Sequence, residues 1–193
     1  MIIFGDDRSG NCLKLKYAAD YLGLDYEWRH VDIMAGEART PEFLDINPMG
    51  QVPALLCDDG RPLAQSNAIL RYLARESALI PADAYRQAQM DAWLFWEQYS
   101  HEPYVAVCRF QHVYLGRARD EIEEWRWERG NGALDLMERH LAGHDWFVDG
   151  GFSIADIALL AYSRVADQGY FDLSSRPALT QWIARCEKLL KLR

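Results

Sequence analysis

The feature that most constrains the fold is a change of hydrophobic pattern near residue 76. Before that point, short apolar segments typical of strands alternate with amphipathic helical segments, whereas almost no strand pattern remains beyond it. With 193 residues, the chain is long enough for one large domain or two small ones. The sequence therefore predicts an α/β domain over residues 1–76, a linker over 77–86 and an all-helical domain over 87–193.

The first part of the predicted α/β domain has the pattern strand, helix, strand. Residues 1–4 are apolar, residues 10–23 carry the stripe of an amphipathic helix with Gly23 at its end, and residues 26–31 alternate as a strand does. Two strands joined through a helix are expected to pair in parallel, with a right-handed crossover.

The second part of this domain adds a short helix, two strands and a further helix. Thr40 is expected to cap the short helix, residues 52–57 and 61–64 to form strands joined by the turn at 58–60, and Ser66 to cap the last helix. This order predicts a mixed sheet of four strands.

The remainder of the chain predicts four helical segments. They are expected at 87–117, at 120–141, from Ser153 onward, and from Pro177 to about 190. Pro103 lies inside the first segment and should bend or split it, because proline lacks the backbone N–H that a helix uses. Ser153 and Asp156 have the spacing of a capping box in its acidic form.

Composition excludes several classes of function. A net charge of −8, from 21 basic and 29 acidic residues, argues against a general nucleic-acid binder. The N-terminus lacks the pattern of a signal peptide, and no apolar run approaches the roughly 18 residues that span a bilayer. Four cysteines form neither a CxxC motif nor a cluster with zinc-ligand spacing. We therefore expect a cytoplasmic protein with reduced thiols, no metal, no nucleic acid and no membrane partner.

Four short motifs follow one another along the chain. They are Ser9-Gly10-Asn11-Cys12, the segment NPMGQVPAL at 47–55, Gln65-Ser66, and FSIAD at 152–156. Together with the α/β-then-helical order, they resemble the cytosolic glutathione transferases, and look most like the serine-type zeta, theta and delta-like groups and their bacterial relatives. The resemblance spans essentially the whole chain. It implies a thioredoxin-like N-terminal domain, a helical C-terminal domain, glutathione as co-substrate, a small electrophile as second substrate, and a homodimer.

The resemblance makes Ser9 and Asn11 the catalytic candidates. The glutathione thiol is a poor nucleophile at neutral pH, because only a few per cent of it is thiolate. Lowering its pKa by about two units requires roughly 2.7 kcal/mol of differential stabilisation of the anion. Ser9, at the entry to the predicted helix, would donate its hydroxyl to the thiolate, and Asn11 would add an amide donor. The alternative is that Ser9 only caps the helix.

Cys12 is the competing candidate for chemistry. It stands where thioredoxin-like redox proteins carry the second cysteine of CxxC, while the position of the attacking thiol is occupied by Ser9. One turn into the helix, we expect Cys12 to be half-buried and inert.

The glutathione-binding candidates follow from the other two N-terminal motifs. The resemblance implies a cis Val52-Pro53 bond, which would leave the Val52 backbone free to pair with the cysteinyl backbone of the tripeptide. Gln51 would point toward the glycyl end. Ser66 would offer its hydroxyl and backbone N–H to the γ-glutamyl carboxylate, and Gln65 would contact the same end.

Two positions depart from the pattern of the family. Gln65 is neutral where many members carry an acidic residue, so recognition of the ligand's α-amine would rest on dipoles or on another carboxylate. Gly50 stands where relatives often carry a larger basic or polar residue, so we expect a weaker hold on the glycyl carboxylate.

The electrophile site is the least specified part of the sequence. Tyr104 and Arg109 follow Pro103, and a helix bent there would aim one face at the cleft that binds the second substrate in the family. Arg109 would hold an anionic substrate, or else be a solvated surface residue. Three alternatives to a transferase stay open: a glutathione-dependent cis-trans isomerase, a thiol oxidoreductase that uses Cys12, and a non-catalytic binding or scaffold protein.

Overall fold

The computed structural model describes residues 1–192 and divides the chain into two compact units, with the boundary between Ile80 and Pro81. The second unit opens with helix α4 (Ala84–Trp96), which Asp83 caps by accepting the backbone N–H of Arg86 at 2.9 Å. The segment expected as a linker over 77–86 is therefore shorter, because this cap starts the helix within it.

The first unit contains four strands and three principal helical segments. In chain order these are β1 (Ile2–Gly5), α1 (Gly10–Leu22), β2 (Glu27–His30), η1 (Glu37–Arg39), α2 (Pro41–Ile46), β3 (Ala54–Leu56), β4 (Pro62–Ala64) and α3 (Ser66–Leu73). The sheet order is β2-β1-β3-β4, with β1 and β2 parallel and the other two pairs antiparallel. The predicted mixed sheet of four strands is confirmed, and its order is the thioredoxin-like one.

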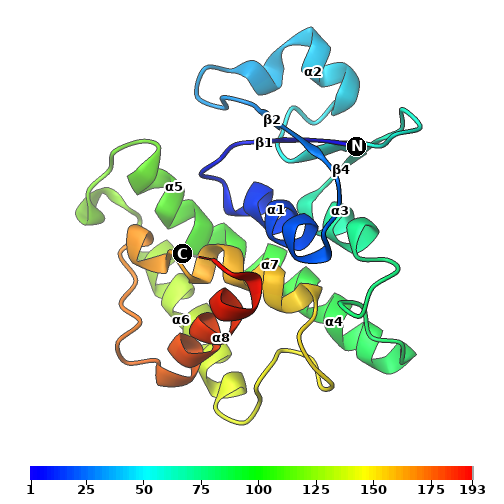
Figure 1. The fold of residues 1–193 in the computed structure, drawn as a ribbon. Helices are drawn as coiled ribbons and strands as arrows, with labels where there is room; N and C mark the ends of the chain where they lie inside the picture. The colour runs from blue at the N-terminus through cyan, green and yellow to red at the C-terminus, as the bar shows by residue number, and fades with distance from the viewer. Residues whose placement is uncertain (193) are drawn as a thin grey trace. The chain divides into compact units, whose positions relative to one another are not determined.

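Successive side chains along each strand point to opposite faces of the sheet, and different helices cover the two faces. Phe4 pairs with Ala54, and both belong to the cluster on the α2 side, where the rings of Phe4 and Phe43 meet edge to face at 6.0 Å. Ile3 and Leu55 pair one residue along, point to the opposite face and are fully buried. Figure 1 shows α2 on one side of the sheet and α1 and α3 on the other.

The start of α3 differs from the prediction by one residue. Gln65, not Ser66, occupies the cap position, with φ of 72°, and Ser66 is the first helical residue. A positive φ is uncommon for a residue with a side chain. The abrupt change of direction between β4 and α3 requires it here, and that tertiary requirement has no local sequence signal.

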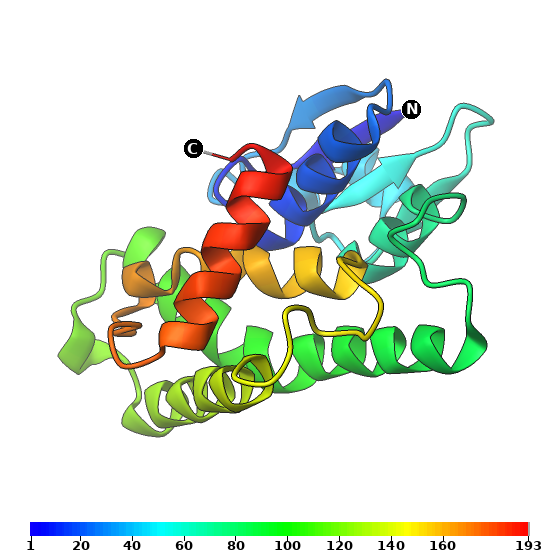
Figure 2. The ribbon, with the colours of Figure 1, turned by 60° about the horizontal axis from the view of Figure 1, so that its bottom comes forward.

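The second unit is entirely helical. After α4 come η2 (Glu97–Ala106), α5 (Val107–Val113), η3 (Arg119–Glu121), α6 (Glu124–Leu141), α7 (Ile154–Ser163), η4 (Ala166–Gly169) and α8 (Pro177–Leu190). Helix α7 packs against α4, η2 and α8, while α6 packs against η2 and α8 (Figure 2). Every residue of α7 is buried, so this helix forms the centre of the unit.

Two predictions about helix ends and breaks are confirmed in this unit. The long first helix is interrupted by η2, a π-helical stretch that contains Pro103, and the Pro103 carbonyl accepts from Arg126 Nη1 at 2.9 Å. Ser153 caps α7 in a capping box with Asp156, whose Oδ2 accepts the Ser153 N–H at 2.9 Å. Trp182 Nε1 also donates to Asp156, at 2.9 Å. Burial raises the pKa of Asp156 to about 6, although these donors oppose the rise.

Candidate functional site

The loop between β1 and α1 carries Ser9, and it is held at several points. The Ser9 N–H donates to the Asp6 carbonyl at 3.2 Å, and Trp28 Nε1 donates to Asp7 Oδ1 at 2.7 Å. Gly5 precedes the loop, and a β-carbon there would lie 2.6 Å from the Trp28 ring. Only glycine therefore allows Trp28 to close over the start of this loop.

Ser9 stands at the cap position of α1, but its side chain does not cap the helix. Its backbone is extended, with φ of −74° and ψ of 120°, and its side chain makes no cap hydrogen bond. The hydroxyl instead bonds to the thiol of Cys12, where it favours the thiolate form. Ser9 thus keeps the N-cap position of α1, as the alternative expects, while its hydroxyl faces a sulfur atom.

Cys12 is more deeply buried than the sequence suggests. Its side chain is fully buried, and its Sγ accepts the Asp6 N–H at 3.4 Å. Burial raises the pKa of its thiol to about 12, against the smaller lowering effects of Ser9 and of the Asp6 N–H. Since the thiolate is the reactive form, a thiol in this setting is inert at neutral pH.

Asn11 connects the start of α1 with the start of α3. Its Oδ1 accepts from Ser66 Oγ at 3.1 Å and from Lys14 Nζ at 2.8 Å. Lys14 Nζ also donates to Asn67 Oδ1 at 3.3 Å. The structure thus brings Asn11 and Ser66 into one hydrogen-bonded group, with Lys14 as a member that the sequence does not predict.

The segment before β3 has the geometry that the resemblance implies. The Val52-Pro53 peptide bond is cis, and the ladder of β3 with β1 begins only at Ala54. Asn47 Nδ2 donates to the Gln51 carbonyl at 2.6 Å and so fixes the approach to this bond. Within residues 1–192, the backbone N–H and carbonyl of Val52 form no hydrogen bond to the chain.

Arg39 is a second residue that the sequence analysis missed. Gly50 has φ of 61°, and a β-carbon on it would lie 2.6 Å from Arg39 Nη1. Arg39 Nη1 also donates to the Met49 carbonyl at 3.3 Å. The guanidinium of Arg39, from the end of η1, therefore lies beside the small residue Gly50. No local signal links the two positions, because they belong to different segments.

Met49 joins this cation to the start of α3. Its carbonyl binds Arg39, and its Sδ lies 3.4 Å from the Gln65 amide nitrogen, which donates to it. Gln51 and Gln65 are both exposed. Met49 therefore links Arg39, which the sequence does not predict, to the predicted residue Gln65.

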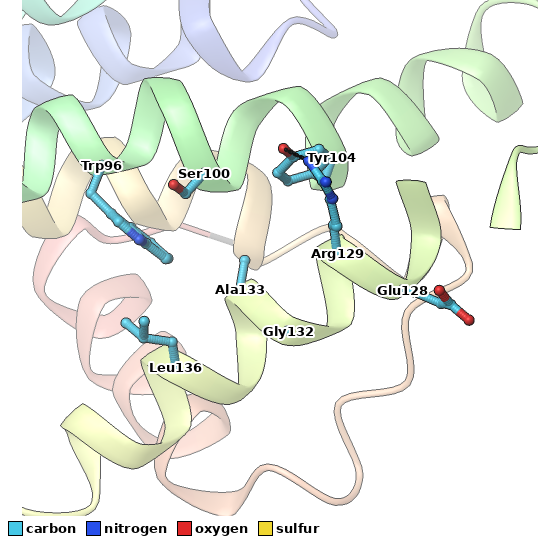
Figure 3. A pocket seen from close by; sticks show the side chains of 8 residues that line it. All are labelled: Trp96, Ser100, Tyr104, Glu128, Arg129, Gly132, Ala133 and Leu136. Atoms are coloured by element: carbon cyan, nitrogen blue, oxygen red, sulfur yellow. Dashed lines mark hydrogen bonds between the residues drawn. The ribbon is translucent and has the colours of Figure 1, made fainter. Parts of the chain in front are cut away.

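The two electrophile-site candidates lie apart from each other in the second unit. Tyr104 lines a cavity of about 460 Å³ between η2 and α6, and Arg129 Nη1 donates to its hydroxyl at 3.0 Å (Figure 3). Arg109 is only 7% exposed, and its Nε donates to Gln168 at 2.8 Å. The solvated alternative for Arg109 is therefore wrong, because its guanidinium is enclosed beside η4.

No helix within residues 1–192 has both the length and the apolar character needed to cross a bilayer. Over the same residues, no three His, Cys, Asp or Glu side chains gather as a metal site.

Comparison with known proteins matches both units to one family. Residues 8–76 match the N-terminal domain of glutathione S-transferase, and residues 101–189 match its C-terminal domain. Glutathione S-transferase 3 of Zea mays is 34% identical over 194 residues, covering 93% of this chain and 86% of its own length. The disulfide-bond oxidoreductase YfcG of Escherichia coli is 31% identical and covers 84% of this chain and 79% of its own length.

A solved structure agrees over nearly the full length. The crystal structure of a glutathione S-transferase from Pseudomonas fluorescens superposes with a TM-score of 0.93 at 46% identity, covering 96% of this chain and 94% of that one. With both domains matched in order, and with relatives above 30% identity over most of their length, the chain belongs to the glutathione S-transferase family.

Proposed function

We propose that this glutathione S-transferase activates the thiol of glutathione through Ser9. The observation that carries the proposal is the Ser9 hydroxyl, which is not used as a helix cap and already donates to a sulfur. A ligand thiolate beside Ser9 would replace the buried Cys12 sulfur as acceptor. The positive end of α1 adds to the stabilisation of the anion.

The rest of the tripeptide is accommodated by groups of the same unit. The first-turn N–H groups of α3, beginning at Ser66, suit the γ-glutamyl carboxylate, with Gln65 next to it. The unpaired backbone of Val52 suits the cysteinyl backbone. Gln51 and the guanidinium of Arg39 suit the glycyl carboxylate, for which Arg39 supplies the charge that Gly50 lacks.

The reaction is then a displacement or an addition by glutathione thiolate. The sulfur lone pair forms a bond to an electrophilic carbon, and a leaving group departs with its electron pair or a conjugated acceptor takes a proton. Tyr104 is retained as an electrophile-site candidate because its ring borders a cavity, whereas Arg109 is not retained because it is enclosed. Ser9 acts as a hydrogen-bond donor throughout and forms no covalent bond.

A homodimer in the cytoplasm completes the proposal. Large aromatic side chains are exposed along one helical stretch of the second unit, with Phe95 at 75% and Tyr99 at 82% exposure, and Trp125 on α6 is 49% exposed. Exposed aromatic surface of this kind favours burial against a second copy. Within the described residues the four cysteines are all free thiols, which fits a reducing compartment.

An ultraviolet difference titration with reduced glutathione at neutral pH tests the proposal. The wild-type protein is expected to give a saturable thiolate band and to conjugate an aryl halide. Ser9→Ala is expected to retain glutathione binding while losing the band and most of the turnover, by about 100-fold. Turnover that is unchanged in Ser9→Ala contradicts the assignment, and absence of binding at millimolar glutathione favours a scaffold protein instead.

Disulfide reduction is a second candidate, favoured by the match to YfcG. Glutathione thiolate would attack a disulfide to give a mixed disulfide and a thiol, and a second glutathione would release the other thiol as glutathione disulfide forms. Ser9 activates the attacking thiol in both reactions, and neither uses Cys12. Assays with an aryl halide, a cis-enone and a small disulfide separate transferase, isomerase and reductase activity.

A further inference from the structure

Lys14 is a fully buried lysine on the same helix as the catalytic candidates. Lysine is almost never fully buried without partners, because removing its ammonium from water is costly. Its Nζ donates to Asn11 at 2.8 Å and to Asn67 at 3.3 Å, both through amide oxygens. Lys16, two residues further along α1, is 45% exposed at its side chain and pairs with Asp20.

The ammonium decides which way the Asn11 amide faces. An amide oxygen and nitrogen are difficult to tell apart from shape alone, but an ammonium group only donates hydrogen bonds. The atom that Lys14 contacts must therefore be the oxygen, and Ser66 Oγ donates to the same atom at 3.1 Å. With Oδ1 turned toward α3, the amide NH2 lies on the other branch of the Asn11 side chain.

The orientation of the Asn11 amide is important because Asn11 lies between two parts of the candidate site. It follows Ser9 by two residues at the start of α1, and it contacts Ser66 at the start of α3. In the proposed function these are the sites of the thiol and of the γ-glutamyl carboxylate. If the amide rotated, Ser66 Oγ would lose its acceptor, and the branch that now carries the NH2 donor would carry an acceptor, which disfavours a thiolate bound beside it.

We propose that Lys14 is a positioning residue for thiol activation, which acts by holding the Asn11 amide with its oxygen on Ser66 and its NH2 group on the side of the bound sulfur. The inference rests on the proposed function, since it concerns the same bound thiol. It adds a residue that touches neither substrate nor the reacting atoms.

The test compares two lysines of one helix. Lys14→Met removes the charge and donors but keeps the length of the side chain, and Lys16→Met is the matched control. The pKa of enzyme-bound glutathione is measured from the thiolate absorbance as a function of pH. Lys14→Met is expected to raise this pKa by about one unit, whereas Lys16→Met is expected to leave it unchanged. Equal pKa values for Lys14→Met and wild type, or equal shifts in both variants, overturn the inference.

A double-mutant cycle shows whether Lys14 acts through Asn11. Lys14→Met removes the direct electrostatic effect of the ammonium on the bound thiol both in the wild type and in an Asn11→Ala variant. The positioning effect, in contrast, requires the Asn11 amide and is absent from the Asn11→Ala variant. Lys14→Met is expected to raise the thiol pKa less in an Asn11→Ala background than in the wild type. An equal rise in the two backgrounds contradicts the proposal. If Lys14→Met does not fold, Lys14→Arg is used in the same cycle, because it keeps the charge but moves the donors.

The outcome also separates this inference from the proposed function. A wild-type protein without any thiolate band removes the proposed function itself. A wild-type band together with a Lys14→Met thiol pKa equal to that of the wild type removes only the positioning role.

Discussion

The guanidinium of Arg39 occupies the space beside Gly50 that a side chain would need. Its Nη1 lies 2.6 Å from the position of a β-carbon on Gly50, and the Gly50 backbone has φ of 61°. The positive φ favours glycine at position 50, and the Ala38 carbonyl oxygen, 3.0 Å from the same β-carbon position, leaves little room for a side chain. Gly50, which the sequence predicts to weaken the hold on the glycyl carboxylate, is thus the residue beside which a cation lies.

Arg39→Ala should weaken glutathione binding. A charge-assisted hydrogen bond to a carboxylate contributes about 1.5–3 kcal/mol, so we expect Kd to rise by roughly tenfold to a hundredfold. Turnover at saturating glutathione should change little, because the glycyl end does not react. Calorimetric titration and steady-state kinetics measure the two quantities.

The control for this change is a shortened ligand. γ-Glutamylcysteine lacks the glycyl carboxylate, so wild type and Arg39→Ala should bind it with similar affinity. If Arg39→Ala weakens both ligands equally, the guanidinium serves the loop around Met49, whose carbonyl it also binds, and not the ligand.

Cys12→Ala should leave the transferase active. The Cys12 thiol is fully buried, and its pKa is raised to about 12 by burial, so it holds too little thiolate to react at neutral pH. Removing its sulfur creates a small cavity and frees the Ser9 hydroxyl, and we expect turnover within about threefold of wild type and a loss of roughly 1 kcal/mol of stability. Disulfide-reductase activity that disappears in Cys12→Ala while conjugation persists would instead assign Cys12 a redox role.

His140 should make stability fall with acidification. Burial lowers the pKa of His140 from its ordinary value, and the neighbouring His144 acts in the same direction. The folded state then binds a proton less readily than the unfolded state, so the contribution of His140 is retained above about pH 6.5 and lost progressively below it. The His140 ring stacks on Phe147 at 5.3 Å and meets Trp93 at 4.9 Å.

His140→Phe isolates that contribution, because it keeps an aromatic ring in the same stack. Thermal unfolding at about pH 7.5 and about pH 5.5 should give a larger drop in Tm for wild type than for His140→Phe. Equal drops for the two proteins would show that other groups cause the acid sensitivity.

Much of the fold could be predicted from local patterns. The helix that ends at Gly23, the capping box of Ser153 with Asp156, and the break at Pro103 all depend on residues within a few positions of one another. The candidates Ser9 and Ser66 are also predicted in this way, because a family motif is a local string. Such features are encoded locally because helix caps and turns are satisfied by neighbours in the chain.

The sequence by itself thus determined the elements, their order and the string of candidate residues in the first unit. Only the tertiary structure decided that Gln65 takes the cap of α3, that Arg109 is enclosed beside Gln168, and that Lys14 holds the amide of Asn11. It also brought Arg39 to Gly50. Each of these depends on the direction of a side chain relative to a segment elsewhere in the chain, and packing sets that direction only once the elements have docked.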